Sequence, residues 1–188
     1  MTQLTQSEQN TLLLIARNAI ESSVRGQKRS DISRFELSPS LKTEGASFVT
    51  FTKEGALRGC IGTLEAYQPL AVDVQEHAIA AALHDPRFPP VQPQECALIG
   101  IEISILTPKE LLMYEGPQDL VDKIRPGIDG VVLQDGFRKA TFLPQVWEKL
   151  HTQAEFLTHL CMKMGANGNL WRKKNLEVFL YQVQEFHE

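Results

Sequence analysis

The segment Leu57–Gly62, with the sequence LRGCIG, constrains the fold most strongly, because it predicts a short strand that contains two glycines. Each glycine weakens a strand by roughly 0.5–1 kcal/mol relative to alanine. A glycine inside a strand therefore indicates close approach by another backbone or by a ligand, or a bulge that redirects a side chain. Since Arg58 and Cys60 alternate with Gly59 and Gly62, we predict that this strand forms part of a functional site.

The composition predicts a soluble globular protein that buries its own core. Of 188 residues, 43% are hydrophobic and 22% are charged, the usual balance for such proteins. The net charge of −4, without a basic block, argues against nucleic-acid binding. No apolar run approaches the roughly 18 residues of a membrane span, and the first apolar run lacks the flanks of a signal peptide. Three cysteines without CxxC spacing predict reduced thiols in a cytoplasmic protein.

Local patterns predict an α+β fold with a mainly antiparallel sheet, because strand pairs joined by short turns are interrupted by helices. A capping box at Thr5–Glu8 and a left-handed stop at Gly26 delimit the first helix. The turn at Glu54-Gly55 and the stronger turn at Asp135-Gly136 each predict a hairpin. Helices are expected at 6–25, 68–84 and 119–124, from 144, and from 152 to 165. Strands are expected at 46–52, 57–62, 98–106, 130–134, 137–142 and 176–183.

Cys60 is the residue whose type and setting point most directly to chemistry. A thiol near a cation has a lowered pKa, which makes it a nucleophile or a soft metal ligand. Arg58 lies two residues away on the predicted strand and so on the same face, where it can activate the thiol or bind an anion. The alternative is that Cys60 is a small buried hydrophobic residue, as free cysteine usually is.

The proline-rich loop 85–90 contains a second charged pair. Asp85 and Arg87 flank Pro86, and they can position a carboxylate or phosphate of a substrate or pair with Arg58. The alternative is an ion pair that only fixes the loop. His77 and His84 share a helical face, but their spacing is not that of a metal-binding pair. We therefore predict no metal site and no cofactor.

Several segments together resemble the AMMECR domain family, whose bacterial members are called AmmeMemoRadiSam system protein A. The resemblance starts from Leu57–Gly62 and covers most of residues 10–185 in the order of the family. The other matching segments are Asp85–Pro90, Gly130–Leu133, Phe142–Trp147 and Phe156–Lys163. The resemblance implies a two-lobed α+β fold within one domain, with a larger lobe whose mainly antiparallel sheet is flanked by helices and a smaller antiparallel lobe.

The same resemblance implies a site in a cleft between the lobes. The residues that it would collect are Arg58, Gly59, Cys60, Gly62, Asp85, Arg87, Phe88 and Gln145. Members of the family are associated with Memo-like and radical S-adenosylmethionine proteins, which implies a shared modification pathway. This chain has no CxxxCxxC cluster motif, so it is not itself the radical enzyme.

Two functions remain open from the sequence. The first is a binding protein that holds a small anion, a peptide or a protein partner in the cleft, which suits the absence of a recognisable catalytic set. The second is a cysteine-dependent enzyme or modification component, with Cys60 as nucleophile or acceptor and Arg58 as its activator. No histidine is placed by the sequence as the general base.

Overall fold

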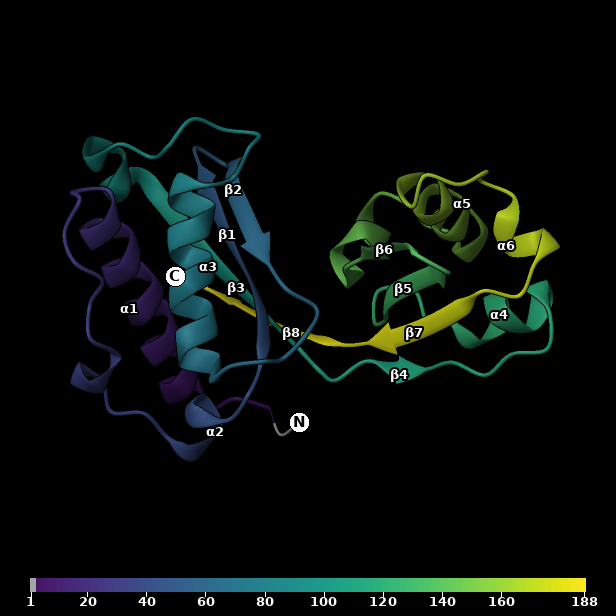
Figure 1. Ribbon diagram of the computed structural model, residues 1–188, viewed down its shortest axis with the longest axis horizontal. Coiled ribbons are helices and arrows are strands. Elements are labelled where there is room, and N and C mark those ends of the chain that lie inside the picture. The colour runs from purple at the N-terminus through teal and green to yellow at the C-terminus, as the bar shows by residue number, and fades with distance from the viewer. Residues whose placement is uncertain (1–2) are drawn as a thin grey trace. The chain divides into compact units, whose positions relative to one another are not determined.

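The computed structural model describes residues 3–188, and the chain divides into two compact units. Unit 1 comprises the chain up to Leu106 together with Gln184–Glu188, and unit 2 comprises Thr107–Val183. Each unit has its own four-stranded antiparallel sheet, with strand order β2-β1-β3-β8 in unit 1 and β4-β7-β5-β6 in unit 2 (Figure 1). The predicted α+β class with two antiparallel lobes is therefore confirmed.

In unit 1, two helices pack on one face of the sheet. Helix α1 (Gln6–Ser23) begins at the predicted capping box, in which Thr5 and Glu8 each accept the other's amide, and it is followed by Gly26 at φ 65°. Helix α3 (Leu70–Leu83) lies beside α1 and over strand β1 (Figure 1). Its alanines allow the helix to approach the sheet closely, and four of them are fully or almost fully buried in the core.

Unit 1 contains the predicted hairpin and the predicted isoleucine-rich strand. Strand β1 (Ala46–Lys53) turns into β2 (Ala56–Gly62) through two residues of positive φ, Glu54 and Gly55. Strand β3 (Ile99–Leu106) pairs with the other side of β1. Its four isoleucines at alternate positions are buried in the core formed with the helices. Short elements that the sequence did not predict are α2 (Pro39–Lys42) and the 3-10 helices η1 (Ile32–Arg34) and η2 (Pro93–Leu98).

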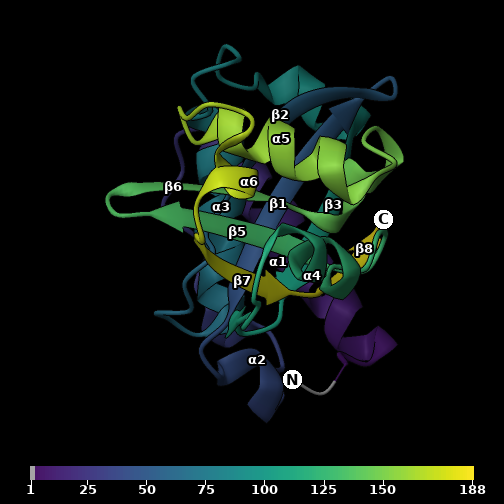
Figure 2. The same ribbon diagram turned by 90° about the vertical axis from the view of Figure 1, so that its right-hand side faces the viewer.

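Unit 2 packs its helices against a separate sheet. Strands β5 (Gly130–Asp135) and β6 (Arg138–Phe142) form the predicted Asp-Gly hairpin, and α5 (Gln153–Lys163) lies over it (Figure 2). In the core, the Trp147 indole stacks on the Phe156 ring with a centroid separation of 3.8 Å. The remaining elements are β4 (Glu110–Leu111), α4 (Pro117–Lys123), η3 (Pro144–Glu148), α6 (Leu170–Lys173) and β7 (Glu177–Tyr181).

The predicted closing strand 176–183 is two strands that belong to different sheets. Strand β7 ends at Tyr181 in the sheet of unit 2, and β8 (Val183–His187) joins the sheet of unit 1. The residue between them is held by Thr107: the Gln182 amide donates to Thr107 Oγ1, and the Thr107 amide donates to Gln182 O, both at 2.9 Å. The break could not be predicted from the sequence, because an alternating apolar pattern fits a strand in either sheet.

In the part of the chain that the structure describes, no helix combines the length and apolar character needed to cross a membrane.

Candidate functional site

Strand β2 is an edge strand, and a bulge interrupts its pairing with β1. Thr50 pairs with Cys60 and Phe51 with Gly59, but Thr52 pairs with Leu57. Arg58 is therefore the extra residue of the bulge. A bulge breaks the alternation of side chains between the two faces of a strand. This removes the basis for the predicted shared face of Arg58 and Cys60.

The two glycines of β2 are required by packing against backbone and side chains of unit 1. A Cβ at Gly59 would lie 2.4 Å from the carbonyl oxygen of Ala81 in α3. A Cβ at Gly62 would lie 2.3 Å from the Phe48 ring and 2.4 Å from the Ser47 carbonyl oxygen. Of the explanations that the sequence allows for these glycines, close approach by another part of the chain accounts for both.

Asp85 and Arg87 cover the free edge of β2 at Cys60. Asp85 Oδ2 accepts the Cys60 amide at 2.8 Å, and Arg87 Nη2 donates to the Cys60 carbonyl at 3.0 Å. The same guanidinium donates to both carboxylate oxygens of Asp85, at 2.9 Å from Nε and 2.6 Å from Nη2. The loop thus satisfies a donor and an acceptor that an edge strand otherwise leaves open for pairing with another chain.

The ion pair is buried at one end and open at the other. The Asp85 side chain is 1% exposed and the Arg87 side chain is 52% exposed. Hydrogen bonds from the Arg87 guanidinium, followed by those from the Cys60 and Arg87 amides, hold the pKa of Asp85 well below its usual value. A permanently ionised, buried carboxylate therefore fixes an accessible guanidinium in one orientation.

Cys60 contacts a hydroxyl group through its thiol and this guanidinium through its carbonyl oxygen. Thr50, its cross-strand partner, donates from Oγ1 to Sγ at 3.2 Å. The hydrogen bonds to Asp85, and to a lesser extent the proximity of Cys60, raise the pKa of Arg87. Cys60 is half-buried, whereas Cys96 and Cys161 are buried. Burial raises the pKa of both of these other thiols.

Phe88 lies against the same guanidinium. The Arg87 guanidinium carbon is 5.5 Å from the centroid of the half-buried Phe88 ring, within the range of a cation–π contact. The Phe88 amide donates to the Asp85 carbonyl at 3.2 Å, which closes the loop into a turn. Among the predicted site residues, the structure therefore brings together Cys60, Asp85, Arg87 and Phe88.

Arg58 belongs to a separate charged cluster. Its Nε and Nη2 donate to the two carboxylate oxygens of Glu95, at 3.3 and 3.1 Å, and Lys53 Nζ lies 3.0 Å from the same carboxylate. The Arg58 side chain is only 12% exposed, so Glu95 supplies the counter-charge that its burial requires. These contacts do not support the predicted role of Arg58 as activator of the thiol, and that role stays a prediction.

Glu95 in this cluster gives the first testable prediction. Hydrogen bonds from Arg58, the Gln92 amide and Lys53 lower its pKa to about 2. A carboxyl whose pKa is lower in the folded state stabilises the fold above its unfolded pKa of about 4.3, and this contribution is lost as the pH falls. We expect Glu95→Gln to lower the free energy of unfolding at pH 7 by about 1–3 kcal/mol.

The measurement is urea unfolding of the wild type and Glu95→Gln between pH 7 and pH 2. The difference between the two proteins should shrink as the pH falls from 5 towards 2. The exposed carboxyl of Glu54, on the β1–β2 turn, supplies a matched control in Glu54→Gln. A stability difference that is the same at pH 2.5 and pH 7 would contradict the proposed charge cluster.

Gln145 lies in unit 2, on η3, whereas the other predicted site residues lie in unit 1. The site between two lobes that the resemblance implied therefore stays a prediction.

The sequence did not indicate that Thr50 and Glu95 contact the predicted site residues. The Gln92–Glu95 capping box was a signal for Glu95, but Thr50 could not be matched to Cys60 while the bulge was unknown.

A buried polar cluster was also missed, although its i, i+4 spacing is visible in the sequence. Asp73 Oδ2 accepts from Ser47 Oγ at 2.6 Å and lies 3.1 Å from His77 Nδ1. Both partners meet the same carboxylate oxygen, and Ser47 is buried, so this is not the arrangement of a serine nucleophile with its base. Within residues 3–188, no three histidine, cysteine, aspartate or glutamate side chains are grouped to hold a metal ion.

Comparison with known proteins places the whole chain in one family. The AMMECR1 family model matches residues 13–186. A protein of Methanothermobacter thermautotrophicus is 41% identical over 186 residues, which cover 98% of this chain and 96% of the relative. Protein MJ0810 of Methanocaldococcus jannaschii is 40% identical over 70% of this chain and 66% of its own.

The fold has also been seen in a solved structure. The crystal structure of the uncharacterized protein PH0010 from Pyrococcus horikoshii superposes with a TM-score of 0.90 at 31% sequence identity. The match covers 98% of this chain and 93% of that one. With a family match across both units and a relative of 41% identity over nearly its full length, the chain belongs to the AMMECR1 family.

Proposed function

We propose that this protein binds a small anionic group of a partner molecule, a carboxylate or a phosphate, at the Arg87 guanidinium beside Cys60. The observation that carries the proposal is the combination of a half-exposed guanidinium with a buried carboxylate that fixes it. The hydrogen bonds from Arg87 to Asp85 and to the Cys60 carbonyl use its Nε and Nη2 atoms. The remaining amino group, Nη1, is left for a ligand or for the neighbouring thiol.

The fixed geometry favours binding for two reasons. A guanidinium presents its N–H groups in a rigid fork that suits carboxylate and phosphate oxygens. Because Asp85 and the Cys60 carbonyl already hold the side chain, less side-chain entropy is lost when a ligand binds. The partner is predicted to belong to a pathway shared with Memo-like and radical S-adenosylmethionine proteins, which rests on the family resemblance alone.

The second candidate is a cysteine-dependent reaction or modification at Cys60. It is favoured by the position of the half-buried Cys60 thiol, whose Sγ lies 3.2 Å from the Thr50 hydroxyl, while the carbonyl oxygen of the same residue accepts from Arg87. In this candidate Arg87, and not Arg58, supplies the cation. An anionic group held at Arg87 would then lie next to the sulfur, so the two candidates share one site.

Alkylation of Cys60 with a neutral and an anionic reagent tests both candidates. Iodoacetamide and iodoacetate transfer similar groups, but only iodoacetate carries the negative charge that Arg87 would attract. We expect the ratio of the iodoacetate rate to the iodoacetamide rate at Cys60 to exceed that of 2-mercaptoethanol by about threefold or more. Inorganic phosphate should slow both reactions. Rates are measured by mass spectrometry on the folded protein.

The controls separate charge from folding. Arg87→Gln should return the ratio to that of the free thiol, and Arg87→Lys should retain part of the preference. The buried thiols of Cys96 and Cys161 report any unfolding of each variant. If the ratio at Cys60 equals that of the free thiol and phosphate has no effect, the anion site is absent. If Cys60 reacts only after unfolding, the reactive-cysteine candidate also fails.

A further inference from the structure

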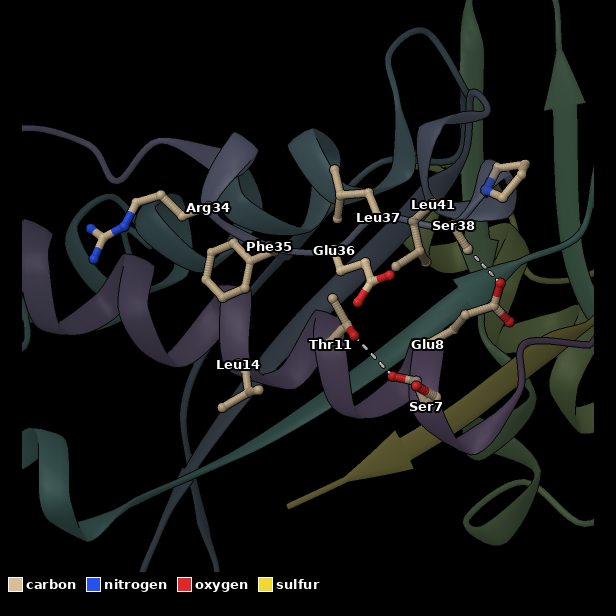
Figure 3. A pocket seen from close by; sticks show the side chains of 11 residues that line it. Ser7, Glu8, Thr11, Leu14, Arg34, Phe35, Glu36, Leu37, Ser38 and Leu41 are labelled. Atoms are coloured by element: carbon tan, nitrogen blue, oxygen red, sulfur yellow. Dashed lines mark hydrogen bonds between the residues drawn. The ribbon is translucent and has the colours of Figure 1, made fainter.

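A second surface of unit 1, which shares no residue with the Cys60 site, forms a groove of about 700 Å³ (Figure 3). One wall is α1 from Ser7 to Leu14, and the other is the segment from Arg34 to Leu41. Pockets that bind ligands typically measure about 300–1,000 Å³. Since a helix rises 1.5 Å per residue and an extended chain about 3.3 Å, this length of α1 matches about three residues of extended peptide.

One part of the groove has an apolar lining. Leu14 is 55% exposed, although the leucines and isoleucine on either side of it in α1 are buried. Phe35 and Leu37 line the opposite wall and are only partly buried. Covering such surface with an apolar side chain is favourable by about 25 cal/mol per Å².

Glu8 contributes a fixed negative charge to the groove. Its carboxylate accepts from Ser38 Oγ at 2.6 Å, from the Thr5 amide at 2.8 Å and from Thr5 Oγ1 at 2.9 Å. These hydrogen bonds, that from Ser38 most of all, lower the pKa of Glu8 to about 2. The carboxylate is therefore ionised at every physiological pH, and two walls of the groove hold it in place.

Glu36 adds a second carboxylate, on the loop wall. Its side chain extends from the loop towards Thr11 of α1 (Figure 3), and it is exposed. The lining also contains one basic residue, Arg34. It lies beyond Phe35, at the end of the groove opposite Glu8 (Figure 3). The middle of the groove thus carries negative charge beside the apolar lining of Leu14 and Phe35.

We propose that this groove binds an extended peptide segment of a partner protein that has a lysine or arginine next to an apolar side chain. The basic side chain reaches Glu36 and Glu8, and the apolar side chain covers Leu14 and Phe35. A lysine or arginine side chain suits this role because its long apolar stem packs along the groove while its charge stays at the carboxylates. The proposal is independent of the anion site at Arg87.

A titration by amide NMR with the peptide acetyl-Leu-Lys-Leu-amide tests the proposal. We expect the largest chemical-shift changes at residues 7–14 and 34–41. Glu36→Gln should weaken binding by about threefold or more, because one charge partner is removed from an exposed position that does not support the fold. Added salt should weaken binding to the wild type for the same reason.

Two matched controls make the test decisive. Glu54→Gln, on the exposed β1–β2 turn, should bind as the wild type does. The peptide with norleucine in place of lysine should bind more weakly, by a factor similar to that of Glu36→Gln. Each of three outcomes would overturn the proposal. The chemical-shift changes could lie outside residues 7–14 and 34–41, Glu36→Gln could bind the peptide as tightly as the wild type does, or the norleucine peptide could bind as tightly as the lysine peptide. Butylamine binding as tightly as the peptide would also overturn it, in favour of small amines.

Discussion

Replacing Gly59 with alanine is expected to destabilise unit 1 by about 3 kcal/mol or more. The added Cβ would lie 2.4 Å from the Ala81 carbonyl oxygen and 3.3 Å from its carbon. Because these are backbone atoms of α3, no side-chain rotation relieves the contact, and the helix or the strand must move. Movement of α3 would in turn disturb its buried contacts with α1 and β1.

The matched control is Gly100→Ala on strand β3, which pairs with the other side of β1. The nearest atom to a Cβ at Gly100 is the Thr52 hydroxyl oxygen, at 3.0 Å, and this side chain can rotate away. We expect a change of about 0.5 kcal/mol or less. If Gly59→Ala were as mild as Gly100→Ala in urea unfolding, the close approach of β2 and α3 would be wrong.

The same experiment tests the predicted single domain. Both tryptophans, Trp147 and Trp171, lie in unit 2, so their fluorescence reports unit 2, whereas far-UV circular dichroism reports both units. If the units unfold as one domain, Gly59→Ala should shift both signals to lower urea together. A fluorescence transition that stays unchanged while the circular dichroism shifts would show that the units unfold separately.

Replacing Asp85 with alanine is the second substitution with a large expected effect. It removes the acceptor of the Cys60 amide and the anchor of Arg87 at once. Breaking a buried ion pair from one side usually costs about 3–5 kcal/mol. Since the half-exposed Arg87 can turn into water, we expect a loss near 3 kcal/mol at pH 7. Asp85→Asn, which keeps an acceptor oxygen for the amide, should lose less.

The contribution of Asp85 to the free energy of unfolding should depend on pH. The pKa of Asp85 is lower in the folded state than its unfolded value of about 3.9. Its contribution is therefore complete above about pH 5 and is lost as the pH falls below 4. In urea unfolding, the difference between the wild type and Asp85→Ala should shrink in acid. Asp119→Ala, which removes an exposed ion pair with Lys123, should cost less than about 1 kcal/mol.

The local elements of this fold follow from contacts between near neighbours in the sequence. The capping box at Thr5 and Glu8, the left-handed stop at Gly26, the turn at Glu54-Gly55 and the alternating isoleucines of β3 are all as predicted. Each depends on residues within about four positions, or on the period of side chains along a strand. The element types and the family resemblance could therefore be predicted without coordinates.

The division of the closing strand could not be predicted in this way. The alternation over residues 176–183 predicts one continuous strand, yet Gln182 is held by Thr107, 75 positions away. Which sheet accepts each half of the strand depends on the two chain crossings between the units. A pattern of period two contains no information on the partner strand.

The sequence by itself determined which residues of unit 1 carry charge and a thiol near β2, and indicated that the glycines of β2 mark close packing or a bulge. Only the tertiary structure decided how these groups are paired. The turn at Glu54-Gly55 alone would pair Thr50 with Gly59, but the bulge at Arg58 pairs it with Cys60. Arg58 then contacts Glu95, and Arg87 is the cation that contacts Cys60, at its carbonyl oxygen. The physical reason is that these contacts join residues 25 to 42 positions apart, and a bulge is stabilised by such distant partners.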